Sequence, residues 1–324
     1  MTTTRLFMSS DSGAPVLTGQ VGSLVSLLHA CLVGTSGVAY GSGGSAKTAA
    51  GWTEPFTNTS TKGVWRNSLA AGGTGFHFRV LDDGSGTAGA KEAFFTGYSA
   101  MTTIDAGSDI TPTAAQMTSG SIIRKSDTAD STARGWYMVA DERTFYLAIE
   151  HNTSTFQGYS IYIGGDFDSE VAGDAYAFLI GGRMTANITG GSEAFLNAAP
   201  SLSSSASNGL FVVRGIAGTG TALPISIAPG IFSSSQLGGA GGVADPSPGG
   251  ANRYFARAAI VNEGTIRGFL RGLYVPISNL TSLANGTVIS GASGLASGSN
   301  LILLRGSSNT PADARVAIET SLSW

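Results

Sequence analysis

The sequence predicts a mainly β fold, an antiparallel β-sandwich or barrel with a short N-terminal amphipathic helix and few other helices. Three observations support this. Short runs rich in aromatic and β-branched residues recur along the chain, turn-forming residues separate them, and only one segment spaces its apolar residues as a helix does. Because 42% of the 324 residues are hydrophobic, the chain can bury a core.

The helix is expected over residues 22–33. The apolar residues that recur there at helical spacing are Leu24, Leu27, Leu28, Cys31 and Leu32. We expect this stripe to cover one side of a sheet. Ser23 or Thr18 is expected to cap the start of the helix, and Gly34 to end it.

Strands are expected through the first half of the chain. The runs that indicate them are 63–69, 76–81, 136–139, 144–149 and 159–163. Residues 140–143 separate two of these runs as the turn of a tight hairpin would, which predicts antiparallel neighbours. Within 76–81, apolar residues alternate with His77 and Arg79, so we expect one apolar face and one face in water.

Most of the N-terminal core is expected to come from aromatic side chains. They are Trp52, Trp65, Trp136, Phe145, Tyr146, Phe167 and Tyr176. The pattern loosens after 174–180, and the Ser-rich stretch 201–207 is typical of a linker or surface loop. We therefore expect an N-terminal β domain over 1–190 and a C-terminal β region over 208–324, either separate or packed on the first as one body.

The C-terminal region carries further strand-like runs, at 210–214, 225–228, 254–261, 268–275, 301–305 and 314–319. Residues 233–251 are nearly free of large side chains, and loops of this length are commonly functional or disordered. This loop and residues 1–14 are our candidates for contacts with neighbouring subunits.

Composition excludes several classes of partner. The net charge is −3 with no basic run, so nothing would neutralise a row of phosphates, and we expect no nucleic-acid partner. Cys31 is the single cysteine, which rules out an internal disulfide and a cysteine zinc site.

No apolar run approaches the ~20 residues that span a bilayer. Residues 28–31 loosely resemble a lipoprotein cleavage box, but a basic start and a continuous apolar stretch do not precede them.

Two possible sites of chemistry are interpreted as structural. Residues 41–48 come within one residue of a phosphate-binding loop, but Ala46 stands where glycine is needed and no helix pattern follows. The three histidines, His29, His77 and His151, lie far apart in the sequence, and no Gly-x-Ser-x-Gly accompanies them. We expect them to be packing or surface residues, with no cofactor and no catalytic residues.

The acidic cluster near residue 170 is the best chemical candidate. Its members are Asp166, Asp168, Glu170 and Asp174. Carboxylates at this spacing in a loop occur in calcium sites, and a pair of them would serve a glycosidase. The simpler interpretation, which we favour, is that they cap turns and bond backbone amides in a Gly-rich loop.

A series of short motifs occurs in order over residues 5–180: Gly13–Gly19, Gly22–Leu24 with the Leu-rich helix, Ala50–Phe56, Gly75–Val80 with Asp82 and Asp83, Gly97–Met101, Arg134–Trp136, Asp141–Tyr146, Gly165–Phe167 and Gly173–Tyr176. In these motifs the chain resembles a group of tailed-bacteriophage virion structural proteins. The resemblance implies a non-enzymatic particle component located in the virion, and it implies no catalytic residues.

Two functions remain open from the sequence. The first is a structural virion component of the tail, baseplate, neck or capsid surface that binds other virion proteins and copies of itself. Low charge, 12% of residues against about 25% in an ordinary domain, fits a surface covered by subunits. The second is a tail fibre or spike protein that binds a host-surface glycan or cleaves a polysaccharide, with the acidic cluster at its site.

Overall fold

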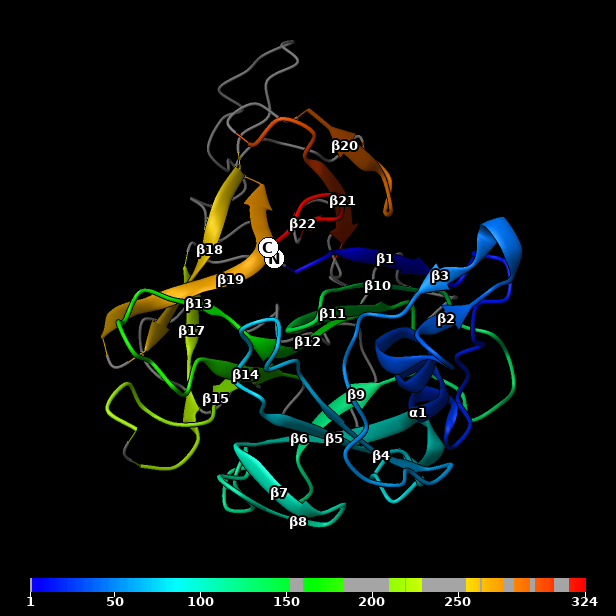
Figure 1. Cartoon of the computed structure of the whole chain (residues 1–324). Helices are drawn as coiled ribbons and strands as arrows, with labels where there is room; N and C mark the ends of the chain where they lie inside the picture. Colours follow the sequence, from blue (N-terminus) through cyan, green and yellow to red (C-terminus); the bar gives the residue numbers. More distant parts are fainter. Residues whose placement is uncertain are drawn as a thin grey trace, which may run out of the picture.

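The computed structural model describes residues 2–151, 160–182, 210–218, 220–228, 255–262, 264–276, 283–291, 295–305 and 315–324. These residues are mainly β, every strand pairing is antiparallel, and they include one short α-helix (Figure 1). The predicted fold class is therefore confirmed, as stacked sheets in the described part of the chain rather than as a closed barrel.

Three sheets lie one above another in Figure 1. The central sheet has the order β1 (Arg5–Met8), β10 (Trp136–Ala140), β11 (Thr144–Ile149), β12 (Ser160–Asp166), β14 (Phe178–Gly181), β15 (Leu210–Val212), β16 (Leu223–Pro224). The lower sheet has the order β4 (Lys62–Arg66), β5 (His77–Leu81), β6 (Glu92–Tyr98), β9 (Ser121–Arg124).

The upper sheet has the order β17 (Ser226–Ala228), β18 (Phe255–Asn262), β19 (Thr265–Pro276), β22 (Arg315–Glu319), β21 (Asn300–Arg305), β20 (Val288–Ser290). The short β13 (Asp168–Ser169) also pairs with β19. Two small hairpins complete the described strands: β2 (Val38–Tyr40) with β3 (Lys47–Thr48), and β7 (Ala100–Thr103) with β8 (Ala106–Ser108).

The central sheet is buried on both faces. Along β11 the side chains alternate, so that Phe145 packs on the lower sheet, where its ring lies 5.0 Å from that of Phe78, while Tyr146 points to the other side and meets Trp324 at 5.5 Å. Because each face of the strand packs against its own layer, residues 145–149 are all apolar.

The aromatic residues expected in one N-terminal core divide between two. Trp52, Trp65, Trp136 and Phe145 are buried between the central and lower sheets, and Tyr176 packs at the edge of that core. Tyr146 and Phe167 are also buried, but they lie in the core shared with the upper sheet, together with apolar residues from beyond position 210. The expected burial is confirmed for these side chains, and the expected single N-terminal core is wrong for two of them.

The helix forms where it was expected, as α1 (Ser23–Leu28) continued by a π-helical turn (His29–Val33) that ends at Gly34. The five residues of its apolar stripe are fully buried. Its predicted cap is wrong: Ser23 bonds the carbonyls of Thr18 and Gln20, and the amide of Leu24 is instead bound by the carboxylate of Asp82, 58 residues away in the sequence.

The face of β5 that was expected to lie in water is largely covered by other side chains. Phe78 and Val80 are buried as predicted. His77 is also buried, because the ring of Phe56 stacks on it at 6.4 Å, and Arg79 lies over the ring of Tyr98. The segment around Phe56 therefore covers a surface that strand alternation alone assigns to solvent.

The expected domain boundary at 190–208 falls within one sheet. β15 and β16 come after it, yet β15 pairs with β14 and extends the central sheet. The linker candidate 201–207 and the loop 233–251 lie outside the described residues. Of residues 1–14, β1 pairs with β10 and buries Phe7, so this part of the N-terminus is bound within the chain rather than free for neighbours.

Candidate functional site

The acidic loop, residues 166–174, connects the central sheet to the upper sheet. It begins at the last residue of β12, and β13 within it pairs with β19. Gly165, in the β12 strand just before the loop, has φ +132, and a Cβ there would lie 2.3 Å from the carbonyl oxygen of Arg143. Glycine is needed at this position because the strand passes so close to the backbone of the neighbouring turn.

Asp166 is completely buried and all its acceptor positions are occupied. Oδ1 accepts hydrogen bonds from Asn67 and Thr74, both at 2.7 Å. Oδ2 accepts from the amide of Thr74 at 3.0 Å and from Nε of Arg143 at 3.1 Å. Burial raises the pKa of Asp166 against the lowering effect of Thr74 and Arg143. This carboxylate fastens the end of β12 to the loop that precedes β5.

Asp168 faces the upper sheet. Its Oδ1 is 2.9 Å from Nη1 of Arg271, and its Oδ2 is 3.2 Å from the exposed guanidinium of Arg257. The side chain of Arg271 is 2% exposed, and its Nη2 also donates to Asp141 of the central sheet at 2.7 Å. Burial would lower the pKa of Arg271, but Asp141 and Asp168 outweigh it and raise the pKa. Arg271 therefore ties the two sheets together.

Asp174 makes a two-pronged pair with Arg267. Oδ2 accepts from Nε and Oδ1 from Nη2, both at 2.8 Å, and both side chains are almost fully buried. Burial would raise the pKa of Asp174, but hydrogen bonds from Arg267 and Ser169 outweigh it and lower the pKa. Glu170, by contrast, is exposed, and its backbone amide bonds the carbonyl of Arg267.

The four predicted acids thus lie in one loop without converging on one point. Asp166, Asp168 and Asp174 each bind a different arginine, Arg143, Arg271 and Arg267 respectively. Within the described ranges, no three His, Cys, Asp or Glu side chains are grouped so as to hold a metal ion. This arrangement supports the structural interpretation of the loop and gives the calcium and glycosidase hypotheses no free pair of carboxylates.

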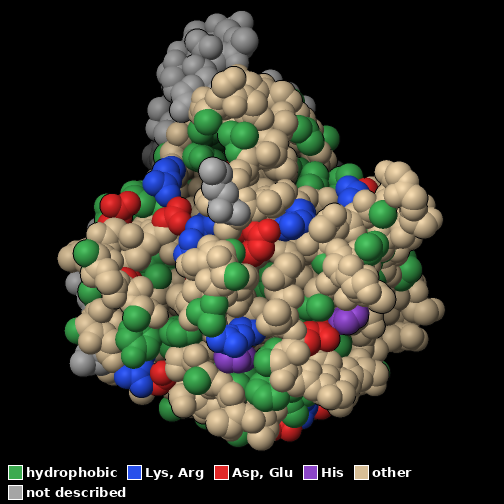
Figure 2. Space-filling view, viewed as in Figure 1, with side chains coloured by type: hydrophobic (Ala, Val, Ile, Leu, Met, Phe, Trp, Pro, Cys, Tyr) green, Lys and Arg blue, Asp and Glu red, His purple; other side chains and the backbone are tan. Residues whose placement is uncertain are grey.

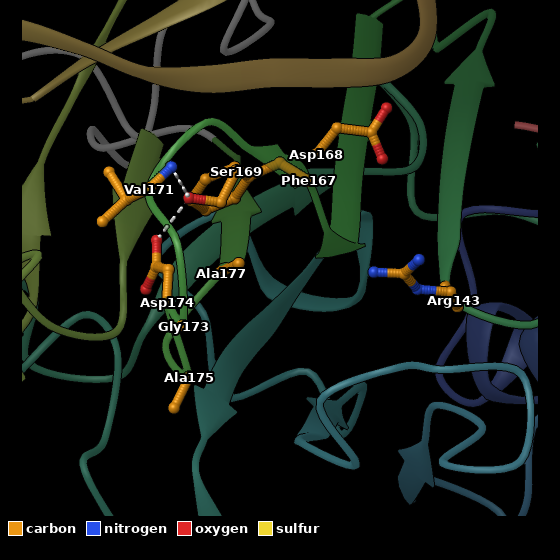
Figure 3. Close-up of a pocket in the computed structure, with 9 residues that line it drawn as sticks. All are labelled: Arg143, Phe167, Asp168, Ser169, Val171, Gly173, Asp174, Ala175 and Ala177. Atoms are coloured by element: carbon orange, nitrogen blue, oxygen red, sulfur yellow. Dashed lines mark hydrogen bonds between the residues drawn. The ribbon is translucent and has the colours of Figure 1, made fainter.

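An open hollow of about 510 Å³ lies beside the acidic loop. Figure 3 shows Arg143 at the right of this hollow with Asp168 above it, and Asp174 on the left, bonded to Ser169. Phe167 and Ala177 supply apolar wall. Because Asp166, Asp168 and Asp174 are already held by arginines, no carboxylate here is free to act as a general acid or base.

The three histidines occupy separate structural places, as expected. His29 is half-exposed and lies 2.8 Å from Glu54. Burial, and then Arg66, lowers the pKa of His77 to about 4, so this ring is neutral near pH 7. His151 lies 2.9 Å from the hydroxyl of Ser160, a contact that strand spacing could not predict. Both partners of that contact are buried, which denies a substrate access to the serine.

The near-match to a phosphate-binding loop forms the β2–β3 hairpin. Gly43–Ser45 make a single 3₁₀ turn, β3 follows, and Nζ of Lys47 lies 3.3 Å from Asp11. A phosphate-binding loop requires a helix at this point. Cys31, the residue of the lipoprotein-like box, is buried in the core.

Sequence reasoning missed the arginines that hold the acidic loop. Arg257, Arg267 and Arg271 lie about a hundred positions later in the sequence, and no local pattern marks them as partners of the acids. The one available signal is that Arg267 and Arg271 are four positions apart in a strand-like run, which places both on one face of β19.

A scan against models of known protein families and a search of curated proteins both find no match to this chain. No helix in the described part of the chain is long and apolar enough to cross a membrane.

Proposed function

We propose that this protein is a non-enzymatic structural component of a tailed bacteriophage particle. In this proposal it belongs to the tail, baseplate, neck or capsid surface of the virion, where it binds other virion proteins and copies of itself, without nucleic acid or membrane insertion. The resemblance of residues 5–180 to virion structural proteins supports it, as does the way the chain uses its charged residues.

The inward direction of the charges is the observation that carries the proposal. Among the residues that the structure describes, five cationic side chains are at most 9% exposed and form ion pairs: Arg124, Lys125, Arg134, Arg267 and Arg271. Arginine and lysine are rarely buried in this way. Since the chain has only 18 cationic residues, their burial leaves the exterior with little charge.

The surface of the protein carries few charged side chains. On the face shown in Figure 2, charged side chains are few and scattered, and most of the area is backbone and small polar side chains. Residues 35–46, which include the β2–β3 turn, carry no charge and are largely exposed. A neutral surface can be covered by another subunit without stripping water from an ion, which is the costly part of burying a charge.

The acidic loop weighs against the glycan-cleaving alternative. A glycosidase needs two carboxyl groups free to flank a scissile bond. Asp166 accepts four hydrogen bonds and Asp174 is held on both oxygens, so neither can take that role. The same loop does have a mechanical role, because it links two sheets.

Mass spectrometry of purified, disrupted phage particles tests the proposal. We expect peptides of this chain in amounts that correspond to several copies per particle. A chain that is absent from particles and stays a single monomer when purified alone would contradict it. The neighbouring genes then indicate position: a capsid gene beside this one favours the head, and a tape-measure or baseplate gene favours the tail.

A further inference from the structure

Lys125 is an exception among the buried cations. In the described part of the chain, the other cations that are at most 9% exposed and ion-paired are arginines, which stay charged in any protein environment. Lys125 and its partner Asp82 are both 0% exposed. A lysine amine can lose its proton when buried and then act as a nucleophile, which a guanidinium does not do.

The two side chains are held in direct hydrogen-bond contact. Nζ of Lys125 is 2.5 Å from Oδ1 of Asp82, and it also donates to the carbonyl of Gln20 at 2.6 Å. The other carboxylate oxygen, Oδ2, accepts the amide N–H of Leu24 at 3.0 Å. The amine, the carboxyl carbon and a backbone donor aimed at the carboxyl oxygen are therefore already assembled, away from water.

We propose that Lys125 and Asp82 condense to an intramolecular isopeptide bond, which makes this pair a self-modification site. The reaction needs no oxidant, cofactor or second protein. It stands apart from the proposed virion role, since it depends on the geometry of this pair alone.

The environment favours the neutral forms that react. Burial raises the pKa of Asp82 to about 6 against the lowering effect of Lys125, and burial lowers the pKa of Lys125 against the raising effect of Asp82. Both shifts move the pair from ammonium and carboxylate toward amine and carboxylic acid. That proton transfer, from Nζ to Oδ1, is the first step.

The bond-forming steps balance without further reactants. The lone pair of the neutral Nζ attacks Cγ of Asp82, and negative charge develops on Oδ2, where the Leu24 amide stabilises it. The intermediate collapses as the Oδ1 hydroxyl leaves with a second proton from nitrogen, as water. One C–N bond forms and one C–O bond breaks. The remaining N–H of the new amide can still donate to the carbonyl of Gln20.

Such a bond would fasten the end of β5 to the end of β9. Asp82 follows β5, Lys125 follows β9, and the start of α1 lies against both through Leu24 and Gln20. The link would run across the lower sheet, over β6, which lies between those two strands. Mechanical load that pulls the edge strand β9 away from β5 would then be carried by a covalent bond.

Intact-mass spectrometry of the freshly purified full chain tests this directly. We expect a mass about 18 Da below that of the sequence, since one water is lost. Tryptic digestion of the denatured protein should yield one species that joins residues 80–91 to residues 125–134, uncleaved after Lys125. A mass equal to that of the sequence, together with tryptic cleavage after Lys125, would overturn the proposal.

Three comparisons test whether the loss of water comes from a bond between Lys125 and Asp82. A succinimide at Asp83-Gly84 gives the same mass change, but within a single peptide, and that result would also overturn the proposal. Lys62 lies 2.6 Å from Asp105 in an exposed pair, where water stabilises the ions, so these two residues should stay unlinked in the same digest. K125R keeps the positive charge and should restore the full mass; a reduced mass in K125R would contradict the assignment.

Discussion

Removing the Arg271 side chain should cost the protein a large part of its stability. The guanidinium is 2% exposed and binds Asp141 of the central sheet, which is 0% exposed, and Asp168 of the acidic loop. In R271A, the buried side chain of Asp141 would lose its cationic partner. Removing one partner of a buried ion pair costs about 3–5 kcal/mol of unfolding free energy.

R257A is the matched control for this experiment. Arg257 binds the same carboxylate of Asp168, at 3.2 Å, but its side chain is 47% exposed, and an exposed pair contributes about 0–1 kcal/mol. Urea unfolding followed by tryptophan fluorescence measures both variants. If R271A and R257A lose the same stability within about 1 kcal/mol, Arg271 does not fasten the two sheets and the reasoning fails.

Three further predictions concern the core, pH and calcium. F78A should lose about 3–5 kcal/mol of unfolding free energy, because Phe78 is buried among aromatic rings between two sheets. L69A, at an exposed site, should change the unfolding free energy by less than about 0.5 kcal/mol. Equal losses for the two variants in urea unfolding would contradict the assignment of Phe78 to the layer between the sheets. The pKa of His77 is about 4 in the folded protein, against 6.5 for an ordinary histidine, so the unfolded chain binds a proton at this residue first as the pH falls. The free energy of unfolding should therefore decline by up to about 3 kcal/mol between pH 6.5 and pH 4. H77Q should flatten that part of the pH profile, and a profile unchanged from the wild type would refute the assignment. Calcium at saturating concentration should leave the melting temperature unchanged, because the loop carboxylates are held by arginines; a clear rise would restore the calcium hypothesis.

Local pattern was enough to predict the helix and several of the strands, whereas β1, β6 and β9 lie outside the predicted strand runs. The helix follows from its leucine spacing, and the hairpin of β10 and β11 follows from two apolar runs around a short polar turn. That turn closes as expected, because Asp141 accepts the amides of Arg143 and Thr144. These features depend on residues close together in the sequence, where spacing and turn chemistry act directly.

Several features that the sequence did not predict depend on distant residues. The helix is capped by Asp82 rather than by a neighbour, and His77 is covered by a loop that strand alternation does not include. The acidic loop shows the same limit. We interpreted its carboxylates as caps of turns that bond backbone amides, whereas their partners Arg267 and Arg271 come from β19, which pairs with β13 about a hundred residues later in the sequence.

Hydrogen–deuterium exchange of the protein alone and within purified particles tests the central claim most directly. The claim is that a chain which turns its charges inward presents a neutral exterior for other subunits to cover. It predicts that exposed, uncharged segments such as residues 35–46 exchange rapidly in the isolated protein and become protected in the particle. Equal exchange of the whole exterior in both states, or the absence of the chain from the particle, would contradict it.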